Sequence, residues 1–249
     1  MFLAGPAQIE MQKETFLDRY KNIKESTNGI ASVSRTFDDL GRTVTERYGD
    51  RANQPTTDNV GVCSKKFTYD KNGFPTEITT LSCSGNPKAS RDGYATTKFD
   101  YDPDGLVIKK SYFDENGEPA SNDDGISITT IEYDKNSRVS FVAFFDSRGQ
   151  PTANKQHVHA INYVYDNLGR PSGRSYLDLE NKPTISSDGY SQVKIQHNDR
   201  DDATEWAYFD TDGTFINGKD GIAIVKNEYD QYGNIISRSF FDKHNKPTI

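Results

Sequence analysis

The chain has 249 residues, a net charge of −7 and 33% hydrophobic residues. Its Lys and Arg residues form no long run, which argues against a nucleic-acid partner, and no apolar stretch is long enough for membrane insertion. The aromatic content of 12% argues against disorder. A thin core, with every part of the chain near the surface, accounts for a folded chain with so few hydrophobic residues.

Residues 1–28 precede the regular part of the chain and have two interpretations. Phe16-Leu17-Asp18 stands 13 residues before Gly29, the same spacing at which Tyr112-Phe113-Asp114 stands before Gly125. This spacing predicts a degenerate half-repeat. A capping helix is the alternative, because apolar residues also recur here at helical spacing, namely Phe16, Tyr20 and Ile23.

From residue 29 to residue 249 a 32-residue unit repeats seven times without insertion or deletion. The residues that open the copies are Gly29, Gly61, Gly93, Gly125, His157, Gly189 and Gly221. With each of them as position 0, position 8 is occupied by Phe37, Tyr69, Tyr101, Tyr133, Tyr165, His197 and Tyr229. So strict a period indicates one supersecondary unit stacked on copies of itself. We therefore expect one array over residues 29–249, preceded by a cap over residues 1–28.

Two turn signals divide each copy into two strands. Asp at position 9 precedes Gly at position 12 in most copies, and Asp at position 21 precedes Gly or Asn at position 24. The Asp side chain can accept from backbone amides two residues further on, and Gly supplies the left-handed conformation that closes the turn. The predicted fold is all-β: an elongated array of antiparallel hairpins with about fourteen strands, as a spiralling sheet or a β-solenoid.

Alternation along the strands predicts which residues share a face. If position 4 lies opposite position 18, and position 2 opposite position 20, the even positions form the core and the odd positions meet solvent. Aromatic residues at positions 1 and 19 then lie on the odd face, where they could stack on sugar rings or anchor a protein partner. They are Tyr48, Tyr94, Tyr112, Phe144, Tyr176, Tyr190 and Tyr208. The alternative is that this row packs against a neighbouring turn of the spiral or a second sheet.

The two cysteines occur in the same copy. Cys63 is at position 2 and Cys83 at position 22, so both are expected on one face of one hairpin, near its open end. A disulfide is compatible with that placement, and the alternative is a pair of small buried thiols in a reducing cytoplasm.

The sequence predicts neither a catalytic site nor a cofactor or metal. Identical acids that recur in turns are not the two unlike carboxylates of a glycosidase. The acidic loops match no calcium motif, and we expect plain turns at 122–125, 187–189 and 219–221. His157 and His159 could begin a zinc site on one strand face, but no third ligand is assigned. His197 is expected to fill the core at position 8.

Short segments of the array resemble the YD repeats of bacterial RHS-type proteins. These segments are Tyr69-Asp70-Lys71-Asn72-Gly73, Tyr101-Asp102-Pro103-Asp104-Gly105 and Tyr165-Asp166-Asn167-Leu168-Gly169-Arg170. The resemblance covers residues 29–249 and implies β-sheet shells on large surface or secreted proteins, including toxins that enclose a C-terminal payload. The chain departs from the family pattern in its longer, fixed unit with a second Tyr-Phe-Asp half, and it shows no terminal toxin or autoprotease segment.

The second half of the unit is similar to another family. Tyr112-Phe113-Asp114-Glu115-Asn116-Gly117 resembles the hairpins of choline- and glucan-binding repeats on bacterial surfaces, which cage a ligand with aromatic side chains. Trp206 is the single tryptophan here, so choline binding is not carried over.

Together these observations predict a non-enzymatic scaffold or binding segment of a bacterial surface or secreted protein. Its partner would be a protein or a cell-surface glycan, with self-association or neighbouring domains of a longer chain as further contacts. Two alternatives stay open: a structural shell segment that encloses or presents another domain, and a carbohydrate-binding module. Residues 1–12 lack the pattern of a signal peptide, and we expect a fragment of a longer protein.

Overall fold

The computed structural model describes residues 11–248, which contain sixteen strands and no helix. The predicted all-β class and the array of antiparallel hairpins are confirmed. The chain forms two compact units, Met1–Asp123 and Asp124–Ile249. Their boundary falls one residue before the end of the third copy, since Gly125 opens the fourth. The described residues include no helix that is long and apolar enough to cross a membrane.

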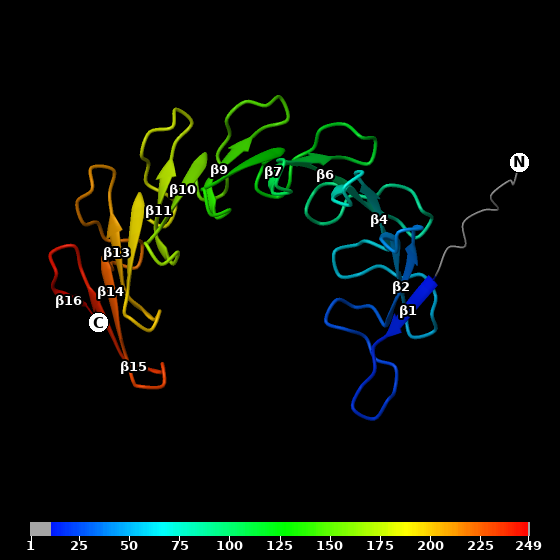
Figure 1. Cartoon of the computed structure of the whole chain (residues 1–249), viewed down its shortest axis with the longest axis horizontal. Coiled ribbons are helices and arrows are strands. Elements are labelled where there is room, and N and C mark those ends of the chain that lie inside the picture. The colour runs from blue at the N-terminus through cyan, green and yellow to red at the C-terminus, as the bar shows by residue number, and fades with distance from the viewer. Residues whose placement is uncertain (1–10, 249) are drawn as a thin grey trace, which may run out of the picture. The chain divides into compact units, whose positions relative to one another are not determined.

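In the first unit each strand pairs antiparallel with the next one in the chain (Figure 1). The strands are β1 (Met11–Thr15), β2 (Ser32–Phe37), β3 (Thr43–Gly49), β4 (Ser64–Tyr69), β5 (Pro75–Leu81), β6 (Thr96–Tyr101) and β7 (Val107–Phe113).

The second unit follows the same rule of chain-order pairing. Its strands are β8 (Ile128–Tyr133), β9 (Val139–Phe145), β10 (Ala160–Tyr165), β11 (Pro171–Leu177), β12 (Gln192–His197), β13 (Ala203–Phe209), β14 (Ile224–Tyr229), β15 (Ile235–Phe241) and β16 (Pro247–Thr248).

The turns form as the Asp-x-x-Gly pattern predicts. In the second copy, Asp70 Oδ1 accepts hydrogen bonds from the backbone N–H groups of Asn72 at 2.9 Å and Phe74 at 2.8 Å. Gly73 closes the turn with a φ of 93°. His157 adopts a φ of 62° at position 0, so the left-handed conformation persists even where the glycine is replaced. The turn geometry is therefore a property of the repeat rather than of glycine alone.

Residues 11–28 continue the pattern of the second half of a copy. Strand β1 pairs with β2, and Asp18 Oδ1 accepts from the N–H groups of Tyr20 at 2.8 Å and Asn22 at 2.9 Å, like the position 21 acids. Lys21 has a φ of 66°, as position 24 requires. These residues form a half-repeat, and the helix alternative is wrong for them. Residues 1–10 lie outside the described residues.

The hairpin register differs from the predicted one by a single residue. Position 4 pairs with position 19, as in Val33 opposite Tyr48, because a bulge shifts the pairing between Thr36 and Phe37. The extra residue reverses the alternation along the second strand. Positions 1, 4, 6, 17 and 19 therefore share one face, which we call the aromatic face. Positions 3, 5, 16, 18 and 20 share the other, which we call the lysine face after the Lys residues common at position 5.

The main apolar clusters lie on the aromatic face. In the second unit Val158, Ile161, Tyr176, Tyr190 and Val193 are buried together. Ile30, Val33, Tyr48 and Val62 form the smaller equivalent in the first unit. On the lysine face, ammonium groups lie over the position 20 rings, for example 4.5 Å from Lys98 Nζ to the centroid of Phe113. The prediction that position 20 joins the core of positions 4 and 6 is thus wrong.

A tyrosine at position 8 ties its copy to the one before it. The hydroxyl of Tyr69 donates to the carbonyl of Thr43 at 2.6 Å, and Tyr165 donates to Val139 at 2.9 Å. Tyr101 and Tyr229 make the same bond. The recurring tyrosine therefore connects neighbouring copies through a backbone carbonyl that is one strand away.

Candidate functional site

The predicted aromatic row lies among the core residues rather than on the polar face. Tyr176 is 1% exposed, Tyr48 6% and Tyr190 9%, while Tyr94, Tyr112, Phe144 and Tyr208 are half-buried. Rings at positions 1 and 19 pack together, with centroids 4.4 Å apart for Tyr94 and Tyr112 and 4.5 Å apart for Tyr190 and Tyr208. Burial raises the pKa of Tyr176 and of Tyr208. Most of these rings therefore pack within the apolar clusters of the aromatic face.

Part of the row borders an open cleft in the second unit, which we call the aromatic cleft. Its volume is about 520 Å³, and it lies on the aromatic face over β10–β13. The strand register brings four of its residues into one row across these strands, namely Tyr163, Arg174, Val193 and Tyr208. Trp206 and Ile195, which are directly paired, line the cleft beside that row.

The aromatic cleft carries hydrogen-bonding groups that the protein itself leaves available. The guanidinium of Arg174 lies 3.5 Å from the Tyr190 hydroxyl and 5.7 Å from the centroid of Tyr176. Among the described residues it has no carboxylate partner. In this part of the chain the indole N–H of Trp206 and the hydroxyl of Tyr163 also have no protein acceptor. Flat apolar rings edged by such donors suit a ligand that is apolar on its faces and polar at its edges.

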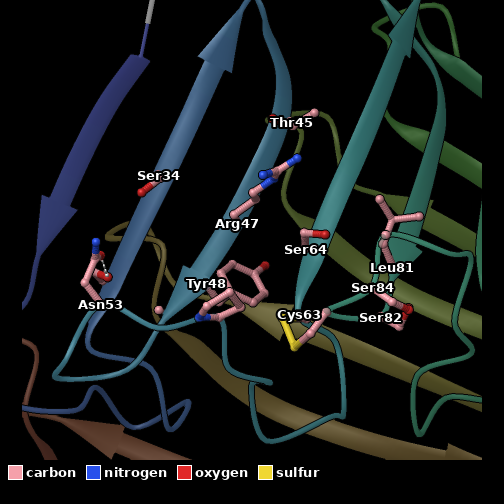
Figure 2. Close-up of a pocket in the computed structure, with 15 residues that line it drawn as sticks. Ser34, Thr45, Arg47, Tyr48, Asn53, Cys63, Ser64, Leu81, Ser82 and Ser84 are labelled. Carbon is pink, nitrogen blue, oxygen red and sulfur yellow. Dashed lines mark hydrogen bonds between the residues drawn. A yellow bond between two sulfur atoms is a disulfide. The ribbon is translucent and has the colours of Figure 1, made fainter.

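The first unit has an open pocket of different chemistry, which we call the hydroxyl pocket (Figure 2). Its volume is about 510 Å³, and Ser32, Ser34, Thr45, Arg47, Ser64, Ser82 and Ser84 are among its lining residues. Gly49, a buried residue, also lines it and occupies position 20, where every later copy has Leu or Phe. A Cβ atom at Gly49 would lie 2.5 Å from Ser32 Oγ. The missing side chain therefore makes room for the pocket.

The disulfide borders the hydroxyl pocket. Cys63 and Cys83 are joined with their Cα atoms 5.0 Å apart, and both residues line the pocket. Cys63 is buried, whereas Cys83 lies on an exposed turn. The disulfide therefore anchors that turn to the start of β4. No free cysteine occurs in the described residues.

The remaining predicted positions do not assemble into a site. His157 is exposed, while His159 is buried edge-on against Phe145 with ring centroids 5.3 Å apart. His197 is half-buried at position 8. Gly189 and Gly221 close turns with positive φ in two of the acidic loops. Nowhere in residues 11–248 do three His, Cys, Asp or Glu residues meet in a geometry that could hold a metal ion.

Sequence reasoning missed the cleft residues with the most distinctive chemistry. Arg174 and Trp206 both occupy position 17, and Arg47 occupies position 18, where the other copies have Thr, Ser or Ala. Gly49 is the other departure from the repeat. Comparing the seven copies column by column gives a signal at positions 18 and 20, where Arg47 and Gly49 depart from the other copies, whereas position 17 differs from copy to copy and gives none.

Comparison with known proteins gives only distant similarities. No family model matches the sequence, and no curated protein matches it. The pore of the Photorhabdus luminescens Tc holotoxin, with a mutated TccC3, is similar at a TM-score of 0.38 and 12% identity, over 94% of this chain and 12% of that one. A TcdB2–TccC3 structure reaches a TM-score of 0.32 at 12% identity, over 95% of this chain and 16% of that one.

A porin-like protein from Bacteroides uniformis is similar at a TM-score of 0.23 and 11% identity, over 77% of this chain and 91% of that one. This chain thus spans less than a fifth of the two toxin structures' chains. Scores this low carry no argument about function. The similarity to YD repeats rests on the motif residues themselves.

Proposed function

We propose that the chain is a non-enzymatic repeat scaffold from a bacterial surface or secreted protein, and that its aromatic cleft binds a carbohydrate. One observation carries the proposal: Trp206, Tyr163 and Tyr208 line an open cleft in which Arg174 has no acidic partner. Sugar rings have apolar faces that stack on aromatic side chains and hydroxyl edges that accept from Trp, Tyr and Arg donors.

The disulfide supports the proposed location. Disulfides form and persist in oxidising compartments such as the bacterial periplasm and cell surface, and they are rare in the cytosol of mesophiles. The bond between Cys63 and Cys83 therefore favours a location of this chain outside the cytoplasm. The turn acids support the absence of catalysis, because their carboxylates are occupied by the backbone amides of their own turns, as at Asp70.

Trp206 provides the test, because it is the only tryptophan of the chain and it lines the cleft. Intrinsic fluorescence titrated with a panel of cell-wall and host oligosaccharides should change saturably for the ligand that binds. Arg174→Gln should weaken that binding by about tenfold, the effect of losing one charged hydrogen bond. Tyr232→Ala is the matched control, since Tyr232 is an exposed aromatic residue of the same unit that does not line the cleft.

A structural shell segment is the second candidate function. The observation that favours it is the burial of Tyr48, Tyr176 and Tyr190, because buried rings of a repeat hold neighbouring copies together. Fluorescence that stays unchanged across the whole panel would overturn carbohydrate binding in the aromatic cleft and leave the shell segment as the better account.

A further inference from the structure

The hydroxyl pocket centres on one row of three side chains. Strand register places Ser34 on β2 opposite Arg47 on β3, and Arg47 opposite Ser64 on β4. Figure 2 shows Arg47 between the strands that carry the two serines, with Thr45 further along β3. Thr45 lies on the same face and shares a 2.6 Å hydroxyl contact with Thr36. A guanidinium is therefore flanked by hydroxyl groups on both neighbouring strands.

The charge of Arg47 is unbalanced by any residue of the pocket. It is the only charged residue among those that line the pocket, and it forms no ion pair with a described residue. Several other arginines are neutralised, as Arg42 is by Asp38 at 2.7 Å and Arg170 by Asp166 at 2.6 Å. Arg47 is exposed, so its guanidinium is open to solvent at the pocket. In a chain with 37 acidic and 30 basic residues, a partnerless arginine that lines a pocket indicates a site for an anion.

The surroundings reinforce that positive charge. Lys66 pairs with Thr45 in the next row of the lysine face and has no ion-pair partner among residues 11–248. Glu77 on β5 is an acid on the same face. Its carboxylate lies 3.8 Å from Lys98 Nζ and accepts from the Thr79 hydroxyl at 3.2 Å. It is therefore engaged with neighbours other than Arg47.

We propose that the hydroxyl pocket binds a sugar that carries a carboxylate or sulfate group. Arg recognises such planar or tetrahedral oxyanions with two parallel hydrogen bonds, and the hydroxyls of Ser34 and Ser64 donate to the remaining oxygens. The pocket volume of about 510 Å³ exceeds what a small inorganic anion fills, and Leu81 and Pro55 line it with apolar surface. A sugar ring fits that surface, whereas a free anion would leave it uncovered.

The disulfide gives this pocket a fixed wall. Ser82, Cys83, Ser84 and Gly85 line one side of it, and the bond from Cys83 to Cys63 holds that turn against the start of β4. Preorganised walls reduce the ordering cost of binding. The oxidised chain is therefore the binding form.

The test is an NMR titration of the oxidised chain, following the amide signals of Ser34, Arg47 and Ser64. Glucuronate should shift these signals saturably, while glucose and inorganic sulfate should bind more weakly by about tenfold or more, the scale of one lost charged interaction. Arg47→Gln should reduce glucuronate affinity by a similar factor. Arg51→Gln, which removes the same charge from an exposed turn of the same copy, should leave it unchanged.

Three outcomes would overturn the proposal. They are no saturable shift with glucuronate, an affinity that Arg47→Gln leaves unchanged while the variant keeps its unfolding midpoint, and inorganic sulfate binding as tightly as glucuronate. Ser64→Ala, a smaller change, should weaken binding severalfold and serves if Arg47→Gln fails to fold. The readout is independent of Trp206 fluorescence, which reports on the other unit, so failure here and failure of the proposed function are distinguishable.

Discussion

The aromatic cleft and the hydroxyl pocket are built on the same repeat and differ in which face they use. The aromatic cleft lies among positions 4, 6, 17 and 19, whereas the hydroxyl pocket lies among positions 3, 5, 16, 18 and 20. Rings surround Arg174 in the first, and hydroxyls surround Arg47 in the second. Each arginine lacks a carboxylate partner among the described residues. The repeating backbone thus sets which side chains lie next to one another across the strands, and the residue types in each row determine what that site can bind.

The two sites differ in how far the residues that line them also belong to the apolar clusters that stabilise the fold. In the aromatic cleft the exposed rim and the buried cluster are continuous, since Trp206 and Tyr163 pack against Tyr176 and Val193. In the first unit the apolar cluster of Ile30, Val33, Tyr48 and Val62 lies on the aromatic face, and only Tyr48 of these four also lines the hydroxyl pocket. The disulfide and Gly49, where the large side chain of position 20 is missing, both line the hydroxyl pocket, and the disulfide ties two parts of its wall together.

Replacing Tyr176 with alanine should cause the largest loss of unfolding free energy and so tests the difference between the two sites most directly. The ring is 1% exposed at the centre of the second unit's cluster, and truncating a buried aromatic residue costs about 3–5 kcal/mol of unfolding free energy. Urea unfolding measures the loss. Trp206→Ala should cost less, because Trp206 is half-buried at the rim. Equal losses for the two variants would contradict the division into rim and core.

Removing the disulfide is the corresponding test for the first unit. The double variant Cys63→Ala, Cys83→Ala opens a covalent loop with a sequence separation of 20 residues, which should lower the unfolding free energy by about 2–4 kcal/mol. Urea unfolding with and without reductant measures it. Reductant should destabilise the parent chain and leave the double variant unchanged. A parent chain that is indifferent to reductant would show that packing alone holds the pocket wall.

Much of the fold was predictable from the period, the turn residues and the alternation. The strands, the tight turns and the half-repeat at residues 11–28 follow from spacings in the sequence. The faces did not, because one unpaired bulge residue at position 15, such as Val44, reverses the alternation along the second strand, and no residue type marks it uniquely. That slip moved Tyr48 and Tyr176 from the predicted polar face into the core, and it hid Arg174 and Trp206, which share that face.

Removing one tyrosine hydroxyl tests the bond that both units share. Tyr165→Phe deletes the hydrogen bond to the Val139 carbonyl and should cost about 1 kcal/mol of unfolding free energy, the net value of such a bond. Tyr163→Phe is the matched control in the same strand, since no described residue accepts from its hydroxyl. Urea unfolding of both variants gives the difference. Identical stabilities would mean that position 8 contributes by packing and not by its hydroxyl.

Low pH should destabilise the two units to different extents, although each Asp carboxyl contributes little to the unfolding free energy. Turn hydrogen bonds lower the pKa of ten Asp carboxyls: Asp18, Asp38 and Asp114 in the first unit, and Asp134, Asp146, Asp166, Asp178, Asp210, Asp230 and Asp242 in the second. At Asp178, for example, the backbone N–H of Lys182 is the largest contributor that lowers the pKa. A carboxyl whose pKa is lowered by folding stabilises the folded state above its unfolded pKa of about 3.9, and this contribution is lost as the pH falls through the folded value.

Because more of these carboxyls belong to the second unit, its amides should lose protection first as the pH falls below about 4. Hydrogen exchange followed by mass spectrometry at a series of pH values measures this order. Acid also gives the chain a large positive charge, which destabilises both units through self-repulsion. Asp178→Asn separates the two causes, since an asparagine keeps the acceptor oxygen and does not titrate. Its hairpin should open with a weaker pH dependence than in the parent, and an unchanged dependence would assign the acid sensitivity to net charge alone.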